Sequence, residues 1–520
     1  MIHEVDKFIG NLTAEEFKKD IAEFHEKTRQ FYEKKISVAE YKHFSGGFGS
    51  YAQRGGERGM LRLRLSGGRI SKDSLRFITE SIQKYQIDRL HLTTCQTVQL
   101  HNLTADTILS LIEEAWDHGI ITRGGGGDYP RNVMMSPLSG VEANEAFDVT
   151  GYVTAAADYL LGFIHKVKLP RKLKVCFSST PANAPHATFR DLGFVANENH
   201  TFDVYAAGGL GNNPKMGVCV ARQIAPEKTL YYIKAMIDTF TAFGNYENRG
   251  RARTRYLQDT LGADGLREAF TEKLNCALQS EDLDLSVPPF SVTKKGDGEI
   301  THPRVIAQKQ PGLYAVSYHP IGGNPTPECI HRLYDAILPM EDVEIRLSPD
   351  EGMYLINCTA KEAETLLALT DDGAETLFET SVACIGNHIC QLGVRDSQTL
   401  LKACVDAVRP CRFADGVLPK IRISGCPSSC SAHQAAALGF RGAVKQSPEG
   451  PKPAYAMFEG GCDASGKESF GTDLCVMTEE NIPKFFVELG QRITEEKTVY
   501  ADWIKGHRED LAALAEEFAK

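Results

Sequence analysis

The chain has 520 residues, too many for one hydrophobic core, and its length predicts roughly three or four domains. Hydrophobic residues make up 42% and charged residues 24%, as in folded globular proteins, so disorder is not expected. The formal net charge of −10 argues against broad nucleic-acid or membrane binding, because both need a basic face. An anionic substrate would therefore have to meet a local cluster of basic residues.

The start of the chain and its cysteines predict the cellular compartment of the protein. Residues 1–7 lack the basic start and apolar run of a secretory signal, and no stretch is long enough for a transmembrane helix. These features predict a cytoplasmic protein. Its 14 cysteines would then be kept reduced, and reduced cysteines bind metal more often than they form disulfides.

The first 45 residues predict helix. Thr13-Ala14-Glu15-Glu16 has the pattern of a capping box. Apolar residues then recur at roughly helical spacing: Phe17, Ile21, Phe24 and Phe31. Glycine-rich stretches at residues 45–59 and 124–127 predict loops.

Between these loops the sequence predicts the order strand, helix, strand, helix, over residues 60–65, 72–84, 89–100 and 105–116. The same order recurs about 250 residues later, which indicates an internal repeat. Its members are a strand at 313–318, a helix at 327–338 and a strand at 343–347. Gly322-Gly323 of the second copy matches Gly67-Gly68 of the first.

The segments that follow each unit also correspond. Residues 169–174 align with 418–423, and residues 192–194 align with 438–440. A repeat of this length predicts an α+β protein made of a duplicated two-domain unit around a pseudo-twofold axis, with a cofactor shared between the halves. The alternative is chance similarity between unrelated α+β segments.

Four cysteines form two pairs, Cys384-x5-Cys390 and Cys426-x3-Cys430. Four thiolates can complete a tetrahedral metal site or ligate a cubane cluster. The spacing is wider than the x2 knuckles of common zinc sites, which favours a cluster, although a structural zinc ion and plain buried thiols are alternatives. Three other cysteines are predicted core residues: Cys176, Cys219 and Cys404.

At these residues the sequence resembles the siroheme-containing sulfite and nitrite reductases, whose signature is Cys-x5-Cys followed by Cys-x3-Cys. The resemblance runs from about Phe48 to Gly461 and includes further motifs at residues 61–68, 131–133, 169–174 and 423–427. It implies an α+β fold of duplicated ferredoxin-like half-domains plus two nitrite/sulfite reductase 4Fe-4S-type domains with pseudo-twofold symmetry.

The resemblance and the repeat together imply five regions. They are an N-terminal helical arm (1–47), a ferredoxin-like half-domain (48–120), a nitrite/sulfite reductase domain (121–285), a second ferredoxin-like half-domain (300–372), and a 4Fe-4S cluster and siroheme domain with C-terminal helices (373–520).

The resemblance also implies siroheme and one [4Fe–4S] cluster as cofactors. Cys384, Cys390, Cys426 and Cys430 would hold the cluster, and Cys430 would bridge it to the siroheme iron. Four basic residues would line the substrate face: Arg62, Arg131, Lys172 and Lys174. Positive charge suits this face because sulfite and nitrite are anions whose reduction consumes protons. Each residue taken alone has a plainer reading, a solvated charge at a strand edge.

Siroheme has a carboxylate-rich periphery. Gln99, His101 and Arg171 match cofactor-contacting positions of the family, with ordinary packing as the alternative. Two departures stand out. The family usually has Arg in a Thr-Thr-Arg-Gln turn, but this chain has Thr93-Thr94-Cys95-Gln96. A contact to a cofactor carboxylate would then be lost or supplied elsewhere, and a free thiol of Cys95 near the haem is the alternative. Residues 349–352, Pro-Asp-Glu-Gly, place acid near a surface that should accept an acidic cofactor.

The resemblance implies six-electron reduction of sulfite to sulfide, because nitrite reductases of the family commonly carry Asn at the position of Lys174. Reduction of nitrite to ammonia at the same site is an alternative. So is a non-enzymatic iron–sulfur electron-transfer protein, whereas the basic residues argue against a relative from cobalamin biosynthesis. The sequence shows no flavin or nicotinamide motif, so we expect electrons from ferredoxin or a separate reductase subunit.

Overall fold

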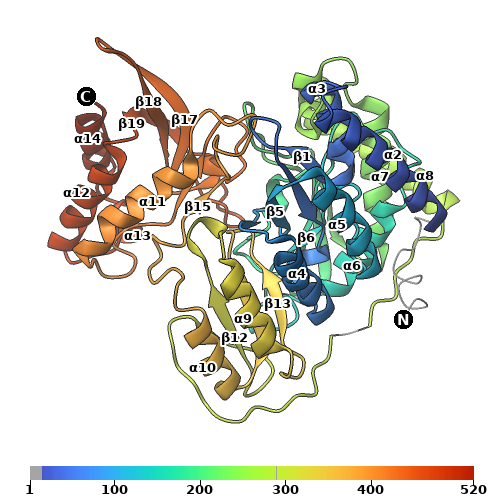
Figure 1. Ribbon diagram of the computed structural model, residues 1–520, viewed down its shortest axis with the longest axis horizontal. Helices are drawn as coiled ribbons and strands as arrows, with labels where there is room; N and C mark the ends of the chain where they lie inside the picture. Colours follow the sequence, from blue (N-terminus) through green and yellow to red (C-terminus); the bar gives the residue numbers. More distant parts are fainter. Residues whose placement is uncertain (1–13, 289) are drawn as a thin grey trace.

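The computed structural model describes residues 14–288 and 290–520, which form four sheets with their covering helices (Figure 1). The first sheet has the order β1-β2-β5-β4. Its strands are β1 (Ser50–Ala52), β2 (Gly59–Leu63), β4 (Leu90–Leu92) and β5 (Val98–Leu103). Helices α4 (Lys72–Tyr85) and α5 (Ala105–Asp117) belong to this unit, and each begins at a hydroxyl cap, Ser71 and Thr104.

The helical start is confirmed from Ala14 onward, as two helices, α2 (Ala14–Tyr32) and α3 (Val38–Ser45). Phe17 of α2 stacks on Trp116 of α5 with ring centroids 3.7 Å apart, which fixes the arm to the first sheet unit. The predicted capping box includes Thr13 and lies outside the described residues. The loop predicted at 45–59 is partly wrong, because β1 lies inside it and pairs with β2.

The second sheet has the order β10-β9-β8-β7-β6. Its strands are β6 (Met134–Met135), β7 (Val175–Ser178), β8 (Leu192–Asn197), β9 (Thr201–Ala206) and β10 (Val218–Ile224). Its helices are α6 (Thr150–Leu161), α7 (Thr229–Phe243) and α8 (Leu257–Ser280). The parallel strands β6, β7 and β8 have almost entirely buried side chains in their shared region, as expected for a sheet covered on both faces.

The third and fourth sheets repeat this plan. The third, β11-β12-β14-β13-β3, contains β11 (Val305–Ala307), β12 (Tyr314–Tyr318), β13 (Glu344–Leu347), β14 (Met353–Cys358) and the borrowed β3 (Arg69–Ile70), with helices α9 (Pro327–Ile337) and α10 (Ala360–Leu369). The fourth contains, in order, β15 (Val382–Ala383), β16 (Ile421–Ser424), β17 (Leu438–Ser447), β18 (Gly450–Glu459) and β19 (Thr472–Thr478), with helices α11 (Ser397–Val408), α12 (Ile482–Glu495), α13 (Tyr500–Trp503) and α14 (Arg508–Ala519). No helix among the described residues is long and apolar enough to cross a membrane.

The two glycine pairs confirm the repeat. Gly67 and Gly68 have φ of 61° and 71°, and Gly322 and Gly323 have φ of 62° and 73°, a region that favours glycine. The contacts are reciprocal: a Cβ on Gly68 would lie 3.0 Å from the carbonyl oxygen of Leu347, and one on Gly323 would lie 3.0 Å from that of Leu92. Each glycine turn therefore packs against the other copy. It contacts the residue that ends the first strand of that copy's hairpin.

One predicted register of the repeat is wrong. In the parallel pairings, Val175 lies opposite Leu192 and Ile421 lies opposite Leu438. Val175 therefore corresponds to Ile421 and Lys174 to Lys420, whereas the alignment of 169–174 with 418–423 pairs Lys174 with Ile423. The matching Leu-Pro segments lie outside the sheets, where loop length is free to differ between the copies.

Two further predictions need correction. The strand predicted over 89–100 is a hairpin, because a five-residue turn, 93–97, separates β4 from β5, with Gln96 at φ 53°. Cys176 and Cys404 are buried as predicted, but Cys219 is only half-buried. It lies on the edge strand β10 beside a register shift between Cys219 and Ala221, where no further strand covers it.

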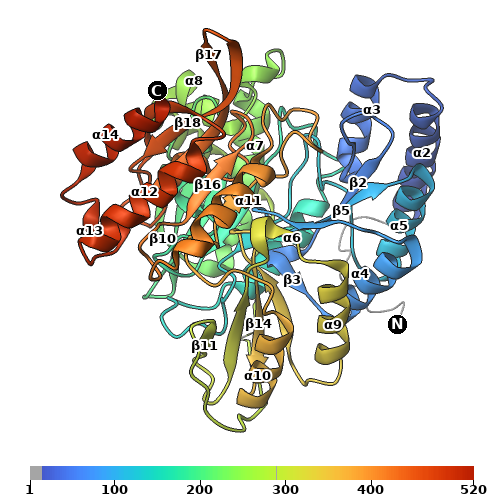
Figure 2. The same cartoon turned by 60° about the vertical axis from the view of Figure 1, so that its left-hand side comes forward.

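Strand β3 joins the two copies. It leaves the first unit and lies beside the strands of the third sheet (Figure 2). There it pairs with β13 through Ile70 opposite Ile345 and Arg69 opposite Arg346. Arg69 also donates two hydrogen bonds of 2.8 Å to Glu344. One apolar core, from Phe17 to Leu366, contains residues of the arm and of both units, so the first and third sheets share a core.

Candidate functional site

Two arginines meet at the glycine run 124–127. Arg62 on β2 donates to the carbonyl oxygen of Gly125 at 2.7 Å, and Arg131 donates to the same oxygen at 2.9 Å and to that of Gly127 at 3.1 Å. Glycine is needed here, since a Cβ on Gly125 would lie 2.8 Å from the Thr122 carbonyl oxygen. The run therefore holds two like charges side by side. The Nε of Arg131 is buried and has no partner.

Two lysines lie next to these arginines. Leu173 forms a parallel bridge with Pro130, and the Arg131 amide donates to the Leu173 carbonyl at 2.9 Å. Lys172 and Lys174 flank Leu173 and so share the face opposite to its side chain. Burial, and then the charges of Arg253, Lys174 and Arg131, lower the pKa of Lys172 well below its ordinary value. The structure thus brings the four predicted basic residues together.

The sequence prediction missed three charged members of this group: Arg190, Asp191 and Arg253. Asp191 has a fully buried side chain that accepts from Arg253 at 3.0 and 3.1 Å, from the Lys174 amide at 2.9 Å and from the Thr254 hydroxyl. Burial opposes ionisation, but Arg253 and Thr254 still hold the pKa of Asp191 below its ordinary value. The arginines at alternate positions in 249–255 were a visible signal, but nothing in the sequence indicated which one turns inward.

Of the predicted periphery, Gln99 and His101 adjoin the basic group and Arg171 lies in an ion pair. Gln99 faces Arg62 across the β2–β5 pairing and lies within hydrogen-bonding distance of Arg62 and of His101 Nε2, at 3.2 Å. Burial holds the pKa of His101 well below its ordinary value, and its Nδ1 has no partner. Arg171 contacts Asp128, which also accepts from Arg249 at 2.6 Å.

The four predicted cysteine ligands lie in two loops at the ends of β15 and β16. Cys426 is buried, Cys384 and Cys390 are half-buried, and Cys430 is exposed. The Cys384 sulfur accepts from the Gly425 amide at 3.2 Å. Although Cys430 is accessible, the surrounding protein desolvates its thiol, and this burial followed by the neighbouring Cys384 raises its pKa to about 12. Cys426 and Cys390 act in the same direction, so the other three predicted ligands all lie within electrostatic range of Cys430.

The cysteine group meets the basic group at Cys430. The Thr94 hydroxyl donates to the Cys430 carbonyl oxygen at 2.8 Å, and the Cys430 thiol lies within electrostatic range of Lys172. Among the described residues, no three His, Cys, Asp or Glu side chains gather tightly enough for a single metal ion. Four thiols around one region, with a backbone amide donating to one of them, are a donor set that suits a cubane cluster.

The acidic turn of the second repeat is neutralised. Asp350 accepts from Lys420 and from Arg422, each at 2.6 Å. Burial is outweighed by these two cations, which hold the pKa of Asp350 far below its ordinary value. Asp350 lies near a surface expected to accept an acidic cofactor. Its negative charge is balanced by Lys420 and Arg422 and so would not repel that cofactor.

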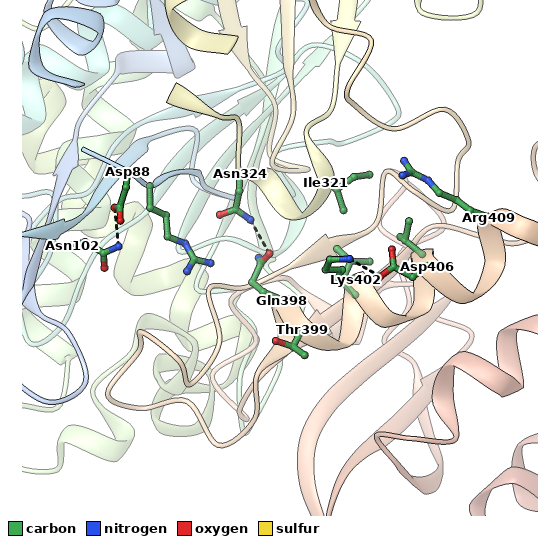
Figure 3. A pocket seen from close by; sticks show the side chains of 12 residues that line it. Asp88, Asn102, Ile321, Asn324, Gln398, Thr399, Lys402, Asp406 and Arg409 are labelled. Carbon is green, nitrogen blue, oxygen red and sulfur yellow. Dashed lines mark hydrogen bonds and ion pairs between the residues drawn. The ribbon is translucent and has the colours of Figure 1, made fainter. Parts of the chain in front are cut away.

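A separate pocket of about 680 Å³ lies between the first sheet, the turn at Ile321 and helix α11 (Figure 3). It contains both signs of charge, among them Asp88, the Lys402–Asp406 ion pair and Arg409. Gln398 in its wall donates to the carbonyl oxygens of Ala383, at 2.5 Å, and Cys384, at 3.4 Å. None of the four basic residues lines this pocket, which backs onto the cysteine loops.

The comparisons with known proteins agree with this geometry. The family described as nitrite and sulphite reductase 4Fe-4S domain matches residues 126–278, and the nitrite/sulfite reductase ferredoxin-like half domain matches residues 51–115. The chain resembles the siroheme-dependent nitrite and sulfite reductase family over both matched segments. It is an oxidoreductase with two ferredoxin-like half-domains and two nitrite/sulfite reductase domains, and its cofactors are siroheme and a [4Fe–4S] cluster.

Relatives of this reductase carry both substrate names. A ferredoxin–nitrite reductase of Synechococcus elongatus is 27% identical over 74% of this chain and 76% of its own length. A sulfite reductase [ferredoxin] of Mycobacterium tuberculosis is 25% identical over 74% of this chain and 69% of its own length. The solved structure of the Mycobacterium tuberculosis NirA protein has the same fold, with a TM-score of 0.75 and 23% identity over 92% of each chain.

Proposed function

We propose that this reductase carries out the six-electron reduction of sulfite to sulfide. The observation that carries the proposal is the pair Lys172 and Lys174, held beside Arg62 and Arg131 and electrostatically coupled to Cys430. Sulfite near neutral pH is partly a dianion, and a site with two lysines as well as two arginines suits the more highly charged of the two substrates.

The cofactor ligands are part of the same proposal. Cys384, Cys390, Cys426 and Cys430 would hold the cluster, and Cys430 is the one of the four that would also face the siroheme. Gln99, His101 and Arg171 would serve the siroheme periphery, where Arg171, now paired with Asp128, could donate to a carboxylate. Buried polar atoms without a partner support this assignment: Arg131 Nε, His101 Nδ1 and Ser429 Oγ. When bound, the two centres supply the electrons.

The side chains of the chain supply charge and protons. Arg62 and Arg131 can hold oxyanion oxygens with directed N–H groups. Lys172 and Lys174 can both pair with the anion and donate protons, because burial lowers the pKa of each. Each oxygen that leaves as water takes up protons, so donors on the substrate face are part of the chemistry.

The electron donor and the compartment are also proposals. Two of the relatives are named as ferredoxin-dependent enzymes, and we propose ferredoxin or a separate reductase subunit as the donor. The structure pairs none of the 14 cysteines in a disulfide, and a chain with this many unpaired cysteines suits a reducing compartment such as the cytoplasm.

Kinetics measured with sulfite and with nitrite test which of the two anions is the substrate. The purified protein, made with siroheme synthesis intact, should show siroheme absorption and should reduce sulfite with reduced methyl viologen. A protein that carries both cofactors and reduces nitrite alone would assign the function to nitrite reduction, the activity named for the Synechococcus relative.

Lys174→Asn should separate the two substrates. We expect kcat/KM for sulfite to fall about tenfold, about 1.4 kcal/mol, and kcat/KM for nitrite to fall less, because the variant removes one cation from the substrate face. Lys168→Asn changes an exposed lysine in the preceding loop and should leave both values unchanged. An equal loss for the two anions at Lys174 would contradict the sulfite assignment.

A further inference from the structure

The turn between β4 and β5 is fixed on three sides. Gln96 donates to the Leu347 carbonyl oxygen at 2.7 Å and accepts from the Met135 amide at 2.9 Å. Asn132 donates to the carbonyl oxygens of Cys95 and Gln96, both at 3.1 Å. Together with the bond from Thr94 to Cys430, these contacts give Cys95 a defined place in the basic group.

Cys95 points at a cation of the substrate face. Its sulfur lies 3.2 Å from Lys174 Nζ, and Arg190 and Arg62 are also close. Burial favours the neutral thiol, but Lys174 and Arg190 outweigh it and lower the pKa of Cys95 to about 6. Nearby cations thus favour the thiolate form of Cys95.

The second copy of the repeat has a carboxylate at the same place. The turns 93–97 and 348–352 each follow the first strand of a hairpin, so Cys95 and Asp350 are both third of five residues. The fourth residues also match: Gln96 accepts from the Met135 amide, and Glu351 accepts from the equivalent Ala383 amide at 3.1 Å. Asp350 pairs with Lys420, the residue that corresponds to Lys174.

We propose that Cys95 is a positioning residue of the anion site: its thiolate pairs with the Lys174 ammonium as Asp350 pairs with Lys420, and so fixes the place and the positive charge of Lys174. The sulfur forms no covalent bond with the substrate. The part of this inference that concerns sulfite rests on the proposed function, whereas the ion pair itself does not.

Several charged groups surround the Cys95–Lys174 pair and affect the pKa values of both members. Lys174 is desolvated, and the Cys95 thiolate is the main group that opposes the resulting loss of its proton. The other groups that face one or both members are Arg62, Arg131, Lys172, Cys176, Arg190, Asp191, Arg253 and Glu351. Most are cations, so removing the thiolate leaves Lys174 with more repulsion and a lower pKa.

Two variants separate charge from volume. Cys95→Ser removes the negative charge at nearly constant size, and Cys95→Asp restores it with the side chain used by the second copy. Cys411→Ser, which changes a half-buried thiol outside the basic group, is the control. In the holoenzyme, kcat/KM for sulfite should have an acid limb near pH 6 in the wild type, set by Cys95.

Cys95→Ser should lose this acid limb, move the alkaline limb to lower pH and reduce kcat/KM about tenfold at neutral pH. Cys95→Asp should restore the alkaline limb and move the acid limb below that of the wild type. Equal pH profiles for wild type and Cys95→Ser, or a Cys95→Asp variant as impaired as Cys95→Ser, would overturn the inference.

Infrared spectroscopy reads the thiol without turnover. The difference spectrum between wild type and Cys95→Ser should lack an S–H stretching band at pH 7 and contain one at pH 5, since the pKa of Cys95 is about 6. An S–H band at pH 7 would refute the ion pair. A protein that lacks this band but does not reduce sulfite would instead refute the proposed function and leave the pair standing.

Discussion

Cys430→Ser is expected to abolish sulfite reduction and to change the haem and cluster spectra together. Cys430 is where the basic group and the cysteine group meet, through Thr94 on one side and the other three thiols on the other. If its sulfur ligates the cluster and bridges to the siroheme iron, a hydroxyl cannot replace it, because soft thiolate is the ligand that iron–sulfur clusters require. The loss in kcat should exceed about 100-fold.

The measurements are methyl viologen activity, the optical spectrum, and electron paramagnetic resonance of the oxidised and reduced protein. Cys276→Ser removes an exposed thiol on α8 and should leave all three unchanged. A Cys430→Ser protein with both centres present and still magnetically coupled would show that another residue forms the bridge.

Asp191→Asn should be the most destabilising single substitution near the substrate face. The side chain is fully buried and neutralises Arg253, while it also holds the Lys174 backbone. Removing its charge leaves Arg253, whose side chain is only 18% exposed, without its counter-ion, which costs about 3 kcal/mol. For a domain the size of the one predicted over residues 121–285, the midpoint of thermal unfolding should fall by at least about 6 °C. Anion binding should be lost as well.

The pH dependence of this effect follows from the sign of the shift. The folded protein lowers the pKa of Asp191, so the stabilisation is present above the ordinary value of 3.8 and is lost as pH falls through the lowered value. The difference between the variant and the wild type should therefore be constant from about pH 5 to 8. Asp203→Asn is the control: its partner Arg222 is 67% exposed, so the change should cost about 1 kcal/mol or less. Equal losses in the two variants would contradict the role of Asp191.

The sequence predicted the repeat and several elements of the arm and of the first and third sheet units, because amphipathic periodicity and glycine positions are local signals. It did not resolve the β4–β5 hairpin, since Thr93 to Thr97 contain neither Gly nor Pro and the turn is made by Gln96 at positive φ. It misaligned Lys174 with Ile423, because register is set by which strands pair and not by the most similar short motif.

The site was predictable only in part, for a related reason. Resemblance to a family points to positions whose residue types are unusual, such as the two lysines and the four cysteines. It does not reveal the partners that those residues acquire in this chain. Asp191, Arg253 and the contact of Cys95 with Lys174 arise from segments far apart in sequence, so only the assembled fold brings them together.

The β3–β13 pairing also constrains how the chain can reach its final state. Arg69 and Glu344 lie 275 residues apart, so an edge of the third sheet is completed by a strand made long before the rest of that sheet leaves the ribosome. Contacts of such separation form late, because a long loop must close first. Until then β13 has an open edge, and a nascent or truncated chain that ends before this strand leaves the apolar surface around Ile70 exposed to aggregation.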